Sequence, residues 1–129
     1  MTFWTDLTKL SKAQLGETAW WLRWYRLHRG DLAGLVYEDT GTDPIDGRAW
    51  AAFQPWYAGH GYLFAFRQGG GQSTQTIALQ GLVADARYRL TNVRTGVALG
   101  TFAGAQLERG VPLTLARPYS AEVLTITLS

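Results

Sequence analysis

The sequence predicts a mainly β fold, an antiparallel β-sandwich of about seven to eight strands preceded by one N-terminal α-helix. Two observations carry this prediction. Residues 11–29 follow a helical period, whereas from residue 31 onward apolar residues fall in short runs separated by turn signals. Short strands at this spacing, with no helical period between them, are typical of an antiparallel sandwich or barrel and not of a parallel sheet.

Length and composition limit the possible classes of protein. The 129 residues can form one hydrophobic core, and we divide them into a lead-in and helix at 1–30 and a β-sandwich at 31–129. The net charge of +2 comes from scattered cations, without the basic cluster that a nucleic-acid partner favours. The sequence also lacks cysteine, a signal peptide and an apolar run long enough for a membrane span. We therefore expect a cytoplasmic protein.

The predicted helix begins after Ser11, which has Gln14 three residues later, the spacing of a capping box. Gly30 is expected to end it in a left-handed conformation. At 100° per residue, the apolar side chains surround this helix and do not form one stripe. A helix of that kind is normally buried, yet a short chain can cover only one of its sides. The sequence therefore predicts an interface, with a partner domain or a second copy, through Trp20, Trp21, Trp24, Tyr25 and His28.

The strand-like part of the chain contains eight candidate segments. Pro55 is expected to end the second of them or limit it to an edge, and the glycine-rich linker 68–73 is expected to form a hairpin loop or cross between sheets. Residues 94–96 have the spacing of a hairpin turn, and 106–110 are expected to form a tight turn. The candidate strands are 32–37, 49–54, 61–67, 74–79, 87–93, 97–102, 111–115 and 121–128.

A search for catalytic chemistry finds no convergent set of residues. Neither histidine has partners at a ligand spacing, and His28 is interpreted as a packed or interface residue. Asp39, Asp43 and Asp46 share a loop but lack the spacing of a calcium site, so turn formation explains them better. The triple glycine at 69–71 is not followed by the lysine of a phosphate-binding loop. We expect no metal, no cofactor and no self-contained active site.

The remaining constellation is aromatic. Exposed Trp and Tyr rings on a β-sandwich can stack on sugars, so a free-standing carbohydrate-binding module is the alternative function. Alternation along the strands predicts that Phe53, Phe64 and Phe66 point into the core. The side chains left as candidate carbohydrate contacts are Trp50, Trp56, Tyr57 and His60.

Several segments together resemble the C-terminal region of α-galactosidases and related glycoside hydrolases. Residues 3–7, together with the helix that begins at Ser11 and ends at 24–29, resemble the close of a catalytic (β/α)-barrel. The tyrosine strand 86–92 and the segments that follow it resemble the β-sandwich after that barrel. These segments are Gly96, 102–107, 110–113 and 118–124.

This resemblance implies a function without chemistry of its own. In such enzymes two aspartates on barrel strands act as the nucleophile and the acid/base of a retaining reaction. The sequence begins after those strands, so no catalytic residue can be assigned to it. The resemblance implies a non-catalytic domain that packs against a catalytic barrel, either cut from a longer enzyme or existing as a short protein.

Overall fold

The computed structural model describes residues 6–39 and 49–129. The chain forms two compact units, Met1–Gly30 and Asp31–Ser129. No helix in the described ranges is long and apolar enough to cross a membrane.

The first unit contains a short 3₁₀ helix, η1 (Leu7–Lys9), and the long helix α1 (Lys12–His28). The capping box expected from the sequence is present. Ser11 Oγ accepts a hydrogen bond from the Gln14 main-chain N–H at 3.1 Å, and Gln14 Oε1 accepts one from the Ser11 N–H at 2.9 Å. Two of the free N–H groups at the helix start are thereby satisfied.

The C-terminal end of α1 differs from the prediction. Arg29 caps the helix in a right-handed conformation, and Gly30 does not have the positive φ expected of it. The chain turns directly into a second 3₁₀ helix, η2 (Asp31–Ala33), so no left-handed residue is needed at this junction. The first predicted strand is correspondingly shorter, because η2 occupies its beginning.

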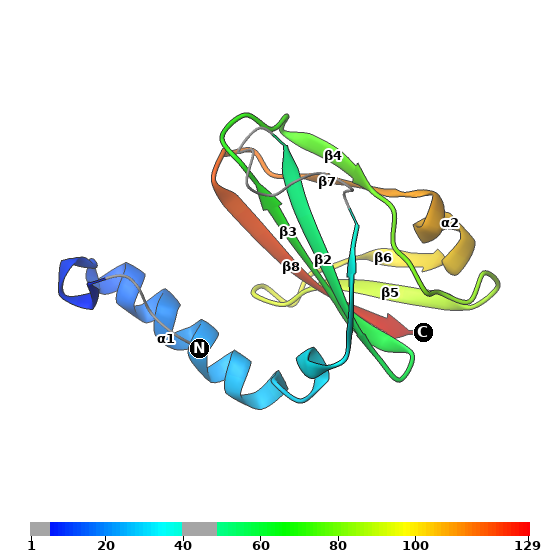
Figure 1. Ribbon diagram of the computed structural model, residues 1–129, viewed down its shortest axis with the longest axis horizontal. Helices are drawn as coiled ribbons and strands as arrows, with labels where there is room; N and C mark the ends of the chain where they lie inside the picture. The colour runs from blue at the N-terminus through cyan, green and yellow to red at the C-terminus, as the bar shows by residue number, and fades with distance from the viewer. Residues whose placement is uncertain (1–5, 40–48) are drawn as a thin grey trace. The chain divides into compact units, whose positions relative to one another are not determined.

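The described residues of the second unit confirm the predicted fold class, with eight strands in antiparallel sheets and the short helix α2 (Figure 1). A six-stranded sheet has the order β1-β2-β3-β8-β5-β6, and β4 and β7 form a two-stranded sheet. The linker 68–73 crosses between the two sheets. The elements are β1 (Leu35–Glu38), β2 (Trp50–Tyr57), β3 (His60–Arg67), β4 (Thr74–Ile77), β5 (Arg87–Asn92), β6 (Ala98–Ala103), α2 (Gly104–Arg109), β7 (Val111–Thr114) and β8 (Ser120–Leu128).

Strand β8 lies in the middle of the large sheet. It pairs with β3 from Gly61↔Ile126 to Arg67↔Ser120, and with β5 from Tyr88↔Leu128 to Asn92↔Leu124. On one side of β8 lies the hairpin β2–β3 with β1 beside it, and on the other side lies the hairpin β5–β6. The two hairpins become one sheet only through β8, as Figure 1 shows by the last strand running between β3 and β5.

The hydrophobic core draws on both sheets and on the segments between them. The large sheet contributes residues that alternate along β2, β3, β5 and β8, and the small sheet and α2 contribute the opposing side chains. The buried cluster contains Trp50, Ala52, Leu63, Ala65, Ile77, Leu79, Leu82, Tyr88, Leu90, Leu107, Val111, Leu113, Leu124 and Ile126.

Two local predictions were wrong. Strand β2 continues through Pro55, which pairs with Val36 of β1, while the pairing of β2 with β3 is interrupted between Phe53 and Trp56. A proline without an N–H is tolerated there because that side of the ladder is already open. Residues 106–110 form no tight turn but the greater part of α2, with Gln106 Oε1 accepting a bond from the Ala103 N–H at 2.8 Å.

Side chains of the large sheet bind main-chain groups of the segments that carry the small sheet. Gln54 is fully buried, and its amide bonds the Gln80 main chain twice, Nε2 donating to the carbonyl at 2.8 Å and Oε1 accepting from the N–H at 2.9 Å. Trp50 Nε1 donates to the Gln72 carbonyl at 2.6 Å. Arg67 Nη1 donates to the carbonyls of Leu115 and Ala116 at 2.7 and 2.9 Å. These bonds satisfy polar groups that would otherwise be buried alone.

Gly104 provides a test of how closely α2 approaches the preceding loop. A Cβ at this position would lie 2.1 Å from the Val83 carbonyl oxygen, a main-chain atom that cannot rotate away. We expect Gly104→Ala to destabilise the sandwich by about 2 kcal/mol or more, because overpacking here moves backbone. Chemical denaturation of both proteins measures this difference. The matched control is Gly16→Ala in α1, where a Cβ meets nothing within 4 Å and helix propensity gains about 0.5–1 kcal/mol.

Candidate interaction surfaces on the helix and the sandwich

The aromatic residues of α1 contact one another along the helix. Trp20 and Trp21 pack edge to face with ring centroids 4.7 Å apart, and Trp21 and Trp24 do so at 5.6 Å. Trp24 stacks on the His28 ring at 4.8 Å. Trp21 Nε1 also donates to Glu17 Oε1 at 3.0 Å. Four of the five predicted interface residues, Trp20, Trp21, Trp24 and His28, therefore form a continuous row of rings.

This row is not withdrawn from solvent. No residue of α1 is buried; Trp20, Trp21, Trp24, Tyr25 and His28 are half-buried. Leu27, one turn beyond Trp24, is 81% exposed. A helix with several large rings and an exposed leucine carries more apolar surface than a solvated helix normally shows, and such surfaces mark interaction sites.

The four residues predicted to contact carbohydrate do not form one platform. Trp50 is 1% exposed and belongs to the core, so its ring faces are closed to a sugar. Trp56 packs against the same core, with its ring centroid 6.1 Å from that of Tyr88. Trp50, Ala52, Gln54 and Trp56 follow one another at every second position of β2, so both tryptophans lie on its inward-facing side.

Tyr57 and His60 do come together on the surface. They flank the two-residue turn Ala58–Gly59, in which both residues have positive φ, the arrangement of a type I′ hairpin. Tyr57 is 53% exposed, and its ring centroid lies 6.0 Å from that of His60. His60 Nε2 lies 3.9 Å from Asp31 Oδ1, an ion pair only when the imidazole is protonated.

Tyr62 lies near the same carboxylate. Burial raises the pKa of the Tyr62 phenol, and the negative charge of Asp31 and a hydrogen bond to it raise the pKa further. The sequence search did not connect Asp31 with Tyr62, because 31 positions separate them and only the folded chain brings them near. The group offers polar and aromatic contacts, without the nucleophile and oxyanion donors that a hydrolytic site needs.

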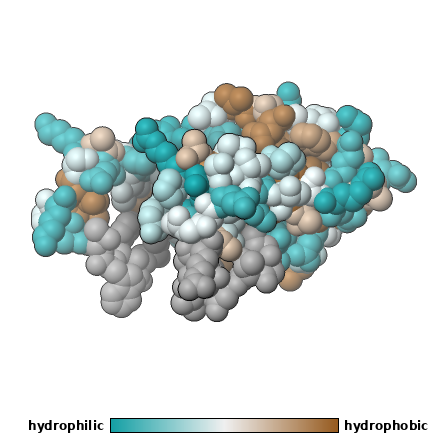
Figure 2. All heavy atoms as spheres, turned by 90° about the horizontal axis from the view of Figure 1, so that it is seen from above, coloured by the Kyte–Doolittle hydropathy of each residue, from teal (hydrophilic) through white to brown (hydrophobic). Residues whose placement is uncertain are grey.

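The phenylalanine prediction was wrong in direction. Phe53 and Phe64 are half-buried and Phe66 is 40% exposed, and none of them belongs to the core cluster. Phe53 pairs with Phe64 and packs edge to face with Phe66 at 6.4 Å, so the three share the outer face of the large sheet. The inward-facing positions of β2 and β3 are those of Trp50 and Leu63, so the predicted alternation was displaced by one residue. Apolar residues also gather in a visible surface patch in Figure 2.

The acidic residues and histidines of the described part of the chain are dispersed. No group of three or more His, Asp or Glu residues there could hold a metal ion. Asp43 and Asp46 lie outside the described residues. Asp39 is half-buried, and Gln80 Nε2 donates to its Oδ1 at 3.1 Å. Burial raises the pKa of Asp39 to about 7; the Gln80 bond opposes this rise and the charge of Glu38 adds to it.

Comparison with known proteins identifies the class of protein to which this fold corresponds. No family model and no curated protein matches the chain. Solved structures of GH36 α-galactosidases do match, over nearly all of it. AgaA from Geobacillus stearothermophilus covers 96% of this chain with a TM-score of 0.73 and 21% identity. The enzyme from Lactobacillus brevis covers 96% with a TM-score of 0.67 and 17% identity.

The galactosidase domain of the α-galactosidase–sucrose kinase AgaSK matches equally well, covering 95% of this chain with a TM-score of 0.73 and 21% identity. This chain spans only 17–18% of the length of these three proteins. The resemblance seen in the sequence is therefore confirmed as a shared fold. The chain has the architecture of one part of a much larger glycoside hydrolase.

The raised pKa of Asp39 makes stability depend on pH. Between the ordinary value of 3.8 and about 7, the folded state holds a proton that the unfolded state releases. Asp39 therefore favours folding most below pH 3.8, and this contribution is lost as pH rises through 7. We expect Asp39→Asn to gain stability relative to the unsubstituted chain over this range, by about 1 kcal/mol after allowing for solvent screening.

Urea unfolding of both proteins across the range measures this gain. A stability difference that stays constant between pH 4 and pH 8 would contradict the assignment.

Proposed function

We propose that this chain is the non-catalytic accessory domain of an α-galactosidase-like glycoside hydrolase, equivalent to the region that follows the catalytic barrel. The observation that carries the proposal is the match in fold over 96% of this chain and only 17% of the enzyme. The sequence segments quoted for the resemblance support an equivalence with the C-terminal end of such enzymes. The proposal includes a location in the cytoplasm, because a chain without cysteine has no disulfide that a reducing compartment would break.

The role of the domain is to pack against a catalytic barrel through the aromatic row of α1. The row supplies large apolar side chains that already contact each other, so little side-chain freedom remains to be lost on docking. Tryptophan and tyrosine are enriched where protein interfaces are strongest. In the absence of a barrel, a second copy of this chain is the available cover for the same residues.

The sequence encoded directly upstream of this chain tests the accessory role. We expect a (β/α)-barrel there, with an aspartate at each of two strand ends. An unrelated upstream sequence would contradict the proposal.

Self-association is the solution test of the interface. We expect light scattering to show dimers at high micromolar concentration, and Trp24→Arg to return the chain to a monomer by placing a charge in the apolar contact. Leu15→Arg is the matched control, because Leu15 lies on the opposite side of α1 at 100° per residue. The proposed interface would be contradicted if the unsubstituted chain were monomeric, or if only Leu15→Arg abolished the dimer.

Catalytic inactivity of the isolated chain is a separate expectation. The two catalytic aspartates of such enzymes lie on barrel strands, so the purified chain should not hydrolyse a chromogenic α-galactoside above the buffer rate. Activity that persists through further purification and disappears with a single carboxylate substitution would show an active site in this chain.

A further inference from the structure

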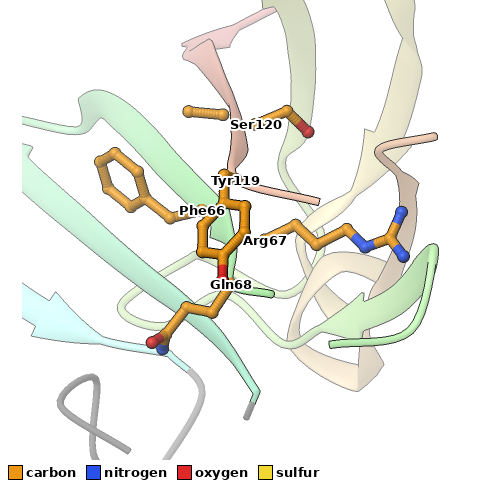
Figure 3. Close-up of a pocket in the computed structure, with 6 residues that line it drawn as sticks. Phe66, Arg67, Gln68, Tyr119 and Ser120 are labelled. Carbon is orange, nitrogen blue, oxygen red and sulfur yellow. The ribbon is translucent and has the colours of Figure 1, made fainter. Parts of the chain in front are cut away.

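A pocket opens on the second unit at the end of β3, next to the turn that leads into β8. It has a volume of about 300 Å³, at the small end of the range for small-molecule sites. Figure 3 shows its side chains in sticks, with the Tyr119 ring beside Phe66 and Arg67. Its lining residues are Phe66, Arg67, Gln68, Tyr119, Ser120 and Ala121.

Tyr119 is held there in an unusual way. Its φ is +56°, a left-handed conformation that a bulky aromatic residue rarely adopts, and it is 86% exposed. Strain of this kind is kept where it serves a function more often than where it serves packing. The ring contributes little to the core, so its exposed face remains available to a ligand.

The end of this ring lies close to Gly69. A Cβ at residue 69 would lie 2.3 Å from the Tyr119 phenol oxygen and 2.6 Å from Cζ. Any larger residue at position 69 would therefore push the end of the Tyr119 side chain aside.

The pocket has the chemistry of a site for an uncharged ligand. Arg67 is the one charged residue in the lining, and its donors bind main-chain carbonyls, Nε that of Gly71 at 3.0 Å and Nη1 those of Leu115 and Ala116. Figure 3 shows the Arg67 and Phe66 side chains extending in opposite directions, so the guanidinium does not face the Phe66 side. An anionic ligand would therefore gain little binding free energy from Arg67.

A polar group that a ligand can use remains on Tyr119. Its hydroxyl belongs to a side chain that is 86% exposed, and it can both donate and accept a hydrogen bond. Ser120 pairs with Arg67 in the register of β3 and β8, and its hydroxyl donates to the Arg117 carbonyl. An exposed aromatic face that carries a hydroxyl suits a flat molecule with one apolar face and a rim of hydroxyls.

We propose that this pocket binds one pyranose ring of a neutral sugar, stacked on Tyr119 and bounded by Phe66. The site is distinct from the predicted contacts at Trp50, Trp56, Tyr57 and His60, and it does not depend on the accessory role proposed above. An apolar side chain of another protein is the competing occupant, and the experiment separates the two.

The experiment follows the backbone and side-chain amide signals of the ¹⁵N-labelled full chain by NMR during titration with raffinose and, separately, with maltotriose. We expect saturable shifts confined to residues 66–69 and 119–121 with at least one of the sugars. Tyr119→Ala should weaken binding about tenfold, the effect of losing one aromatic contact. Tyr119→Phe should retain most of the affinity.

Gly69→Ala is the sharper variant, because it removes no group from the pocket and displaces only the ring. It should weaken binding as much as Tyr119→Ala does. The controls are Gly30→Ala, where a Cβ meets nothing within 4 Å, and Tyr57→Ala, which removes an exposed ring elsewhere. Unshifted methyl signals of the core show that each variant is folded.

Shifts near residues 57–60 in place of the pocket would overturn the proposal. So would unchanged affinity in Tyr119→Ala, or pocket shifts that appear with an apolar peptide and with neither sugar.

Discussion

Hydrogen bonds from side chains of the large sheet to main-chain groups that flank the small sheet are the constraint on which the sandwich depends. The two sheets are unequal, six strands against two, so the small sheet cannot rely on area alone to stay in place. Gln54, Trp50 and Arg67 each reach from the large sheet to main-chain groups beside β4 and β7. A lost partner would leave a buried polar group, which costs more than the bond itself contributes.

The sequence predicted the elements well wherever one local signal dominated. Ser11 and Gln14 placed the start of α1 because a capping box needs only neighbouring residues, and the 94–96 turn placed the β5–β6 hairpin for the same reason. Pro55 was misjudged because its tolerance depends on the neighbouring strand, where the ladder is interrupted. The short helix α2 was missed because six residues carry too little periodicity to distinguish a helix from a turn.

The candidate sites were less predictable, since they depend on which face of a strand each ring occupies. An error of one residue in the alternation exchanges the inner and outer faces of a strand. The prediction made this error, since Trp50 lies in the core and Phe66 on the surface. Tyr119 lies in one of the segments that carry the resemblance, but nothing in the sequence marked it as part of a site. Its importance comes from a left-handed backbone angle and from contact with Gly69, fifty residues away, and neither can be read from composition or spacing.

The central position of β8 has a consequence for biosynthesis. Both of its neighbours, β3 and β5, are made earlier, and each leaves the ribosome with an unpaired edge along the side that β8 will occupy. Open edges of this kind are sites where strands of different chains pair. During translation the nascent unit is therefore prone to aggregate until β8 is made and pairs with both β3 and β5. Chaperone dependence of this protein should reflect that interval more than the stability of the finished fold.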